Sequence, residues 1–343
     1  MRILFVGGFY RGHLLAQKLL ERGEQVVGGF VFEEDAHESV RYCDDIARCF
    51  QAENIWVEKT RRLTTARLDL IRDQLKPDVV FVLGWRTMIP IEILESAPLG
   101  GVAVHDSLLP RLRGFAPTNW GMILGHEQLG ATLFQLAGEV DSGDIYFQDS
   151  IAAQPHETFE SVQRRIAQLS VGLFEAYLDA ARQGTPSGRA QDHTKATYTC
   201  ARGPADGEID WTQSSVTVDR LIRALSTPAP GAFTFYRGER IVIDQALAVA
   251  QPPDYEGRVA GKVVGLDPSA GTVDVLCGHG MLRIARITAA DGASVPATAA
   301  IKSVRETLGL DTTQEILLLR QRVEQLEQML ATIDLVNPRK KAG

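Results

Sequence analysis

The N-terminal half of the chain alternates short apolar runs with longer amphipathic stretches. Residues 3–6 form a continuous apolar run, residues 14–22 have helical spacing that ends at Gly23, and residues 25–31 are typical of a second strand. Further strands are expected at residues 79–83, 102–104 and 132–136, and helices at residues 39–51, 63–75, 117–124 and 157–182. This alternation predicts an α/β domain in which helices cover a parallel sheet.

The second half follows a different pattern of short β-like runs. They occupy residues 233–236, 240–243, 261–266, 272–276 and 281–287, with Gly, Pro and Asp turns between them, and His279 falls in one such turn. This spacing suits a small open barrel. We therefore expect a first domain over residues 1–190, a linker over residues 191–205 and an OB-like domain over residues 206–310. The linker is expected there because residues 183–197 contain Gly184, Pro186 and Gly188.

The C-terminal tail has the spacing of a coiled coil. Apolar residues recur at alternating intervals of three and four, with Arg, Gln and Glu between them; they are Ile316, Leu319, Val323, Leu326, Leu330 and Ile333. A helix over residues 311–337 is expected, and so short a seam is marginal alone. It would pair with another copy of the chain, making a homo-oligomer, or lie on its own second domain.

The composition is that of a globular protein, with 45% hydrophobic and 23% charged residues in a chain of 343. No apolar run approaches the roughly 20 residues that span a bilayer, and the N-terminus lacks a signal-peptide pattern. A cytoplasmic protein without membrane contact is expected. Cys43, Cys49, Cys200 and Cys277 have neither CxxC nor zinc-ligand spacing, which predicts no metal site and no disulfide.

Two polar residues stand where an α/β sheet binds ligands. His105 ends an apolar strand, and Asp141 lies in the small-residue turn Val-Asp-Ser-Gly-Asp-Ile over residues 140–145. A carboxylate from such a turn can orient an imidazole and raise its basicity. The glycines of residues 7–12 do not match the GxGxxG spacing of a dinucleotide site, so we expect them to let the first turn pass close to a ligand or a neighbouring strand.

The residues around His105 and Asp141 form a longer motif, HxSLLPxxRGxxPxxW, then GxxxxGxT, then DxGDI. This motif resembles the 10-formyltetrahydrofolate-dependent formyltransferase superfamily, and most closely its nucleotide-amino-sugar N-formyltransferases. Residues 82–90 look like the family's segment beside the pterin, and residues 207–211 and 223–233 look like the start of its C-terminal barrel. The resemblance covers roughly residues 1 to 305 and implies a Rossmann-like catalytic domain with 10-formyltetrahydrofolate as the formyl donor.

The resemblance also implies roles for individual residues. His105 would polarise the formyl carbonyl or shuttle protons, with Asp141 as its partner and as a water-holder near the amine. The residues expected beside the folate are Leu83, Gly84, Trp85, Arg86, Ile89 and Val140. Those expected beside the acceptor are Ser107, Leu108, Leu109, Pro110, Arg113 and Gly114, and Arg86, Arg111 and Arg113 could meet phosphate or folate carboxylates.

One position departs from the family. Its members usually carry an asparagine two residues before the histidine, as a donor to the developing oxyanion, and this chain has Ala103. Losing such a donor typically costs ~10²–10³ in rate. A backbone N–H, a water or His105 could replace it; the chain could instead resemble the hydrolase-like domain of 10-formyltetrahydrofolate dehydrogenase; or it could be a binding or scaffold homologue without turnover.

The charge distribution narrows the range of acceptors that we expect. The formal net charge is −7, and residues 32–39, where the tRNA-specific relatives carry a basic loop, are acidic here. Since tRNA would be repelled, no nucleic-acid partner is expected. A small primary amine on a nucleotide-linked sugar is the expected acceptor, and the sequence leaves its exact identity open.

Overall fold

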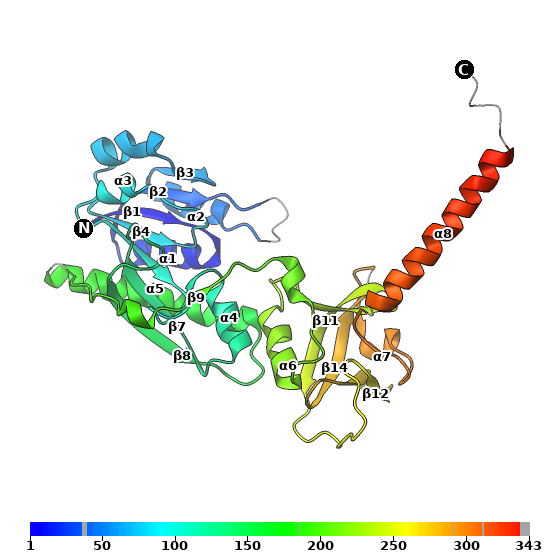
Figure 1. The fold of residues 1–343 in the computed structure, drawn as a ribbon. Helices are drawn as coiled ribbons and strands as arrows, with labels where there is room; N and C mark the ends of the chain where they lie inside the picture. The colour runs from blue at the N-terminus through cyan, green and yellow to red at the C-terminus, as the bar shows by residue number, and fades with distance from the viewer. Residues whose placement is uncertain (36–39, 185, 290, 311, 337–343) are drawn as a thin grey trace. The chain divides into compact units, whose positions relative to one another are not determined.

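The computed structural model of the protein describes residues 1–35, 40–184, 186–289, 291–310 and 312–336, and of residues 312, 314 and 331–336 only the backbone (Figure 1). The chain divides into two compact units. The first unit contains Met1–Pro204 together with Thr227–Ala229, and the second contains Ala205–Ser226 and the chain from Pro230 onward.

A seven-stranded sheet forms the centre of the first unit, as far as the structure describes it, in the order β3-β2-β1-β4-β5-β7-β8. Its strands are β1 (Arg2–Gly7), β2 (Gln25–Phe32), β3 (Val57–Thr60), β4 (Val79–Leu83), β5 (Gly101–His105), β7 (Gln128–Gln135) and β8 (Ile145–Ala152). The five strands from β3 to β5 run parallel, which confirms the predicted parallel central sheet. The antiparallel hairpin of β7 and β8 was not predicted, because the polar residues Gln148, Asp149 and Ser150 hide β8 in the sequence.

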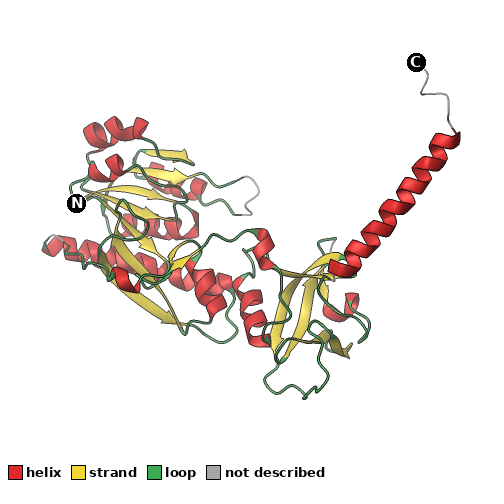
Figure 2. Cartoon of the chain, in the orientation of Figure 1, coloured by secondary structure: helices red, strands yellow, loops and turns green. Residues whose placement is uncertain are grey.

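Helices cover this sheet (Figure 2). They are α1 (Phe9–Glu21), α2 (Cys43–Ala52), α3 (Ile91–Glu95), α4 (Pro117–Leu124) and α5 (Phe159–Gln183). The first unit also contains 3-10 turns at Thr65–Arg67 and His193–Lys195, and a further 3-10 turn at Pro204–Gly207 lies at the boundary between the units. Helix α5 packs against β7 and β8. The helix predicted over residues 63–75 is wrong, since Thr65–Arg67 is a 3-10 turn and Leu70–Leu75 a π-helical turn. Left-handed Lys76, at φ 48°, and then Pro77 end this segment.

Strand β1 lies in the middle of the core. Ile3, Leu4, Phe5 and Val6 are all fully buried, as expected for a continuous apolar run with helices on both faces. Helix α1 already begins at Phe9, so Gly12 is helical rather than part of a loop. A Cβ on Gly12 would lie 3.1 Å from the Leu83 carbonyl oxygen, so this glycine serves the predicted close approach to a neighbouring strand.

The segment expected as a linker is built into the first unit as far as Pro204. Strand β9 (Tyr198–Thr199) pairs in parallel with β6 (Arg113–Gly114), and Arg189 pairs with Ile145 beside β8. These contacts hold residues 189–199 against the turn after His105. Gly184 and Gly188 suggested a linker, but backbone pairing of Arg189 with Ile145 and of β9 with β6 holds the chain that follows them.

The second unit is built on a six-stranded antiparallel sheet in the described part of the chain (Figure 1). Its strands are β10 (Ala232–Tyr236), β11 (Glu239–Ala248), β12 (Val263–Asp267), β13 (Thr272–Leu276), β14 (Met281–Thr288) and β15 (Ser294–Pro296), with helices α6 (Ser215–Ala224) and α7 (Ala297–Ala300). The order is β10-β11-β14-β13-β12, with β15 on β14, and His279 lies in the turn between β13 and β14. The five predicted strands are present; closure into an OB-like barrel remains a prediction.

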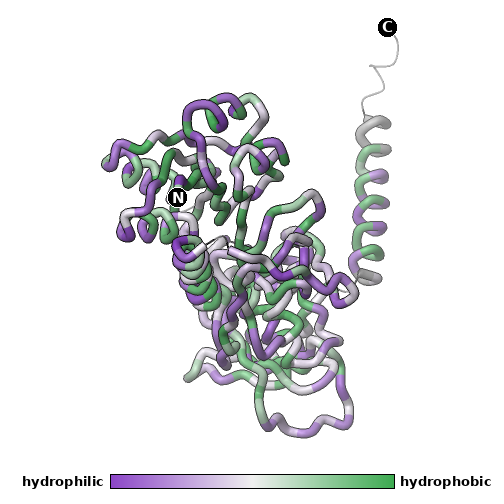
Figure 3. Tube along the Cα trace, turned by 90° about the vertical axis from the view of Figure 1, so that its left-hand side faces the viewer, coloured by the Kyte–Doolittle hydropathy of each residue, from purple (hydrophilic) through white to green (hydrophobic). Residues whose placement is uncertain are grey.

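Helix α8 (Thr312–Val336) ends the described chain. Hydrophobic and hydrophilic residues alternate along it (Figure 3). Its helical conformation agrees with the prediction, whereas the coiled coil stays a prediction. The side chain of Ile333 and residues 337–343 lie outside the described part of the chain. None of the described helices combines the length and the apolar character needed to cross a bilayer.

Candidate active site

His105 is the last residue of β5, at the carboxyl edge of the sheet. Strands β1 and β4 run parallel to β5 and end at the same edge, which is where open α/β sheets bind ligands. The His105 side chain is 9% exposed, and its Nε2 lies 2.7 Å from the carbonyl oxygen of Leu112 in the following loop. The loop after β5 therefore turns back and holds the imidazole.

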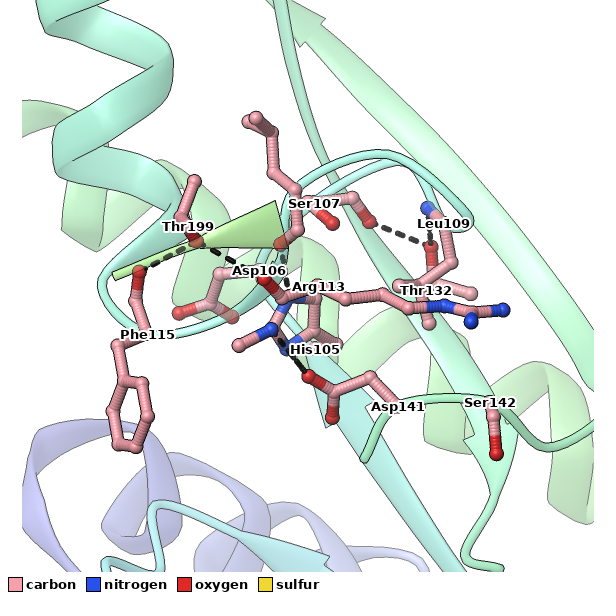
Figure 4. Close-up of polar contacts among 12 residues, drawn as sticks. His105, Asp106, Ser107, Leu109, Arg113, Phe115, Thr132, Asp141, Ser142 and Thr199 are labelled. Carbon is pink, nitrogen blue, oxygen red and sulfur yellow. Dashed lines mark hydrogen bonds and ion pairs between the residues drawn. The ribbon is translucent and has the colours of Figure 1, made fainter. Parts of the chain in front are cut away.

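Asp141 faces this imidazole. Its Oδ2 lies 3.4 Å from His105 Nδ1, and Figure 4 shows the carboxylate directed at the ring. The same oxygen accepts a hydrogen bond of 2.8 Å from the backbone N–H of Gly114. Asp141 has a left-handed backbone with φ 51°, a conformation that costs a non-glycine residue about 1–3 kcal/mol. Such a conformation persists because the surrounding contacts hold it.

The two contacts of His105 determine where protons can sit. A backbone carbonyl only accepts, so Nε2 must donate to Leu112. The neutral ring then presents the lone pair of Nδ1 to the Asp141 carboxylate. A proton on Nδ1 turns this contact into a charge-assisted hydrogen bond. The pair can therefore take up a proton and hold it between imidazole and carboxylate.

A buried network fixes the loop after His105. The hydroxyl of Thr132 donates to the Ser107 carbonyl at 2.6 Å and accepts from the Leu109 N–H at 3.1 Å. Gln148 donates to Thr132 Oγ1 and to the Leu109 carbonyl. Ser107 and Leu109 are each 3% exposed, so their side chains face the protein interior. This differs from the expectation that they contact the acceptor. Their backbone groups are engaged as well, since Thr132 and Gln148 bind the Ser107 carbonyl and both backbone groups of Leu109.

Arg113 corrects another expectation. Its side chain is 2% exposed, and its guanidinium donates to Gln191 Oε1 at 2.5 and 3.2 Å and lies 3.1 Å from His193 Nδ1. Figure 4 shows the guanidinium pointing away from His105. A buried charge needs partners, and the protein itself supplies them. Arg113 thus supports the backbone of Gly114 rather than offering its charge to a substrate phosphate.

Gln191 connects Arg113 to Asp141. Its side-chain nitrogen donates to the Asp141 carbonyl at 2.9 Å and to the Gly143 carbonyl at 2.7 Å. Because one buried amide holds both carbonyls of the turn and is itself held by a guanidinium, it fixes the left-handed conformation of Asp141. Gln191 was not predicted, because it stands in the expected linker and belongs to no motif.

Five of the six residues predicted beside the folate lie at or after the end of β4, whereas Val140 lies in the loop between β7 and β8. Leu83 is 1% exposed and its carbonyl accepts from the Gly8 N–H at 3.2 Å, so its side chain is part of the core and not of an open surface. Trp85 packs edge-on against Phe32, with ring centroids 5.4 Å apart. The Arg86 guanidinium lies 4.1 Å from the ring centroid of Phe9. Gly84 has a left-handed backbone with φ 73°. Ile89 packs against the core, and Val140 is exposed.

Ala103 lies two residues before His105 on the same strand, and so on the same face of the sheet. It is 7% exposed and belongs to an apolar cluster with Leu109, Phe134 and Ile145. This position therefore contributes an apolar surface where the family usually has a hydrogen-bond donor.

Another ion pair beside the site was not predicted. Arg11, in the first turns of α1, makes a two-point contact with the carboxylate of Asp106, the residue after His105. Its stem lies near Gly84. This pair ties together the end of β5, helix α1 and the segment after β4. No local pattern reveals it, because 95 residues separate its partners.

Two family models match the sequence of this chain. The family model described as formyl transferase matches residues 2–178, and the model described as the formyl transferase C-terminal domain matches residues 203–305. The chain belongs to the formyl transferase family. The enzymes of this family transfer a formyl group that 10-formyltetrahydrofolate donates. Gln191, which holds the carbonyl of Asp141, lies between the two matched regions.

Solved structures of other proteins share the fold. HypX from Aquifex aeolicus in complex with tetrahydrofolic acid has a TM-score of 0.60 and 18% identity over 89% of this chain, which spans 47% of HypX. WlaRD, a sugar 3N-formyl transferase solved with dTDP and 5-N-formyl-THF, has a TM-score of 0.62 and 13% identity over 83% of this chain and 96% of its own. The N-formyltransferase from Helicobacter canadensis, solved with folinic acid and dTDP-3-aminofucose, has a TM-score of 0.61 and 13% identity over 82% of this chain and 97% of its own. At these identities the similarity establishes the fold.

Proposed function

We propose that this chain transfers a formyl group from 10-formyltetrahydrofolate to a primary amine on a nucleotide-linked amino sugar. The observation that supports this most directly is the contact of 3.4 Å between His105 and Asp141 at the carboxyl edge of the sheet. Two groups that can exchange a proton there meet the needs of formyl transfer.

The chemistry needs one proton acceptor and one proton donor. When the amine nitrogen attacks the formyl carbon, an oxyanion and an ammonium form, and the bond from that carbon to the folate nitrogen then breaks. Asp141 accepts the ammonium proton and passes it to Nδ1 of His105, and the charge of the imidazolium so formed stabilises the oxyanion. His105 then returns this proton to the leaving nitrogen. The Gly114 N–H keeps the carboxylate in place through these steps.

The folate would lie against the segment after β4. Trp85 Nε1 is buried and has no hydrogen-bond partner among the described residues. A buried donor without a partner is costly, and a folate carbonyl could accept from it. Gly84, Trp85, Arg86, Ile89 and Val140 are the residues we propose around it, with the backbone of Leu83.

Two observations support a small acceptor on a nucleotide sugar. WlaRD and the Helicobacter canadensis enzyme share this fold and were solved with dTDP or a dTDP-sugar. The net charge of −7 also disfavours a polyanion. Leu108, Pro110 and Gly114 would line the acceptor side, with Ser107 and Leu109 buried behind them. Copies of the chain would associate through helix α8.

The deciding experiment follows the release of tetrahydrofolate from 10-formyltetrahydrofolate with and without a panel of dTDP- and UDP-amino sugars. We expect release only with an amino sugar, and a product carrying one added formyl group by mass spectrometry. His105→Ala and Asp141→Asn should each abolish release, because each removes one partner of the proton-transferring pair. His156→Ala and Asp149→Asn change exposed residues and should retain activity. Near-normal turnover in both site variants would disprove the assignment.

Ala103 favours a second candidate function, hydrolysis of 10-formyltetrahydrofolate to formate. Without a side-chain donor at this position, the site has an apolar patch beside the imidazole. Water, held by Asp141, would then replace the amine. Release of tetrahydrofolate without any amino sugar, again lost in Asp141→Asn, would establish hydrolysis, and no release under either condition would indicate a binding protein.

A further inference from the structure

Helix α8 carries an exposed apolar seam. Its residues, Ile316, Leu319, Val323, Leu326 and Leu330, have between 45% and 62% of their surface exposed. They follow one another at intervals of three, four, three and four residues. This is the a and d pattern of a heptad repeat, with a at Ile316, Val323 and Leu330 and d at Leu319 and Leu326. Such a seam buries its side chains when it packs against the matching seam of another helix.

The residue types at a and d favour two strands. Ile316 and Val323 are β-branched and occupy a positions, while both described d positions are leucine. β-Branched residues at a with leucine at d favour two-stranded parallel coiled coils, whereas leucine at a with isoleucine at d favours higher oligomers. Leu330, the last a position, and Ile333, the d position after it, depart from this rule. Leu317 and Leu318 are also exposed but fall at b and c, outside the seam.

The charges beside the seam favour the parallel orientation. In a parallel pair, each g residue faces the e residue of the next heptad on the other helix. Glu315 at g then faces Arg320 at e, and Arg322 at g faces Glu327 at e. Two-fold symmetry repeats both pairs, which gives four attractive contacts. An antiparallel pair that sets Val323 against Leu326 brings Arg320 opposite Glu327 twice, but it puts Arg322 opposite Met329, so only two attractive contacts remain.

We propose that two copies of this chain associate through residues 315–330 of α8 as a parallel two-stranded coiled coil. This deepens the self-association proposed above and does not depend on formyl transfer. The partner is a second copy because the seam is complementary to itself in both shape and charge. The proposal also fixes the register, since Val323 faces Val323 of the second copy.

The first test measures mass in solution. Sedimentation equilibrium of the full chain should show a dimer. Val323→Asp should be monomeric at concentrations at which the wild type is dimeric, because it places two carboxylates in the seam. Gln321→Asp adds the same charge at f, on the outer face, and should remain dimeric. Circular dichroism should show that both variants are folded. A wild-type monomer disproves self-association, and a trimer disproves the two-stranded coil.

The second test measures orientation. Arg320→Glu should raise the dissociation constant about tenfold, because it places glutamates opposite each other twice. Adding Glu315→Arg should restore the wild-type value in a parallel coil. In the antiparallel coil the second change would not help, since the glutamate introduced at position 320 would still face Glu327. Ile316→Cys in a Cys200→Ser background should form a disulfide-linked dimer on oxidation. If the double variant does not recover the wild-type dissociation constant and no disulfide forms at position 316, the parallel orientation is disproved. Self-association through α8 would still stand.

Discussion

At the scale of single residues, the geometry of the active site depends on groups that do no chemistry. Asp141 holds a strained backbone because the Gly114 N–H fixes its carboxylate and Gln191 fixes its carbonyl. Arg113 in turn fixes Gln191. These are positioning residues. Their contribution to catalysis lies in the precision with which a carboxylate faces an imidazole.

Gln191→Glu tests this view. The variant keeps an acceptor for Arg113 but loses the two N–H donors to the Asp141 turn. We expect kcat to fall about a hundredfold, since a displacement of about 1 Å costs roughly that much, while KM for the folate stays near the wild-type value. Steady-state kinetics and near-UV circular dichroism measure both effects. Gln183→Glu on the exposed end of α5 is the control, and an unchanged kcat in Gln191→Glu would refute the positioning role.

At the scale of elements, the segment between the two family domains is part of the catalytic unit. The Thr197 hydroxyl accepts from the Leu112 N–H at 2.9 Å, and Leu112 in turn holds His105. Its strand β9 pairs with β6, next to Gly114. The segment therefore supports both His105 and the Gly114 N–H that holds Asp141, the pair that we propose transfers protons. Its own conformation depends on the 3-10 turn His193–Lys195, which Asp192 caps through Thr194.

This cap should titrate with acid. Hydrogen bonds from Thr194 and the ion pair with Lys195 lower the pKa of Asp192 to about 2, against about 3.9 in an unfolded chain. A lowered pKa stabilises the folded segment above about pH 4, and this contribution is lost as the pH falls to about 2. Hydrogen exchange at the Thr194 amide should therefore show protection that declines over this range. Asp192→Asn should show no such decline, and protection that is independent of pH in the wild type would contradict the cap.

At the scale of the whole molecule, the charge bears on the acceptor that we propose. The net charge of −7 opposes a polyanion, although the acidic stretch after β2 is less exposed than the sequence suggested. Glu34 is 1% exposed and accepts from the N–H groups of Tyr42 and Cys43 at the start of α2, and residues 36–39 lie outside the described residues. The repulsion of tRNA therefore rests on the overall charge rather than on that loop.

We expect methionyl-tRNA to be neither formylated nor bound. The measurement is formyl incorporation into charged initiator tRNA, together with filter binding over a range of salt concentrations. A methionyl-tRNA formyltransferase such as the one from Clostridium thermocellum, whose structure shares this fold with a TM-score of 0.53 and 22% identity, serves as the positive control. Binding that weakens steeply with salt would show that this chain presents a basic face after all.

The sequence by itself determined what depends on neighbouring residues. The apolar runs located the central strands, and the motif around His105 and Asp141 indicated the family, because strand burial and loop chemistry are written in contiguous residues. Only the tertiary structure decided which side chains face the site. Arg113 points into the protein, Gln191 reaches Asp141 across 50 residues, and β8 completes the sheet through pairing with β7. Contacts between distant residues leave no periodic signal, so they become visible only when the chain is folded.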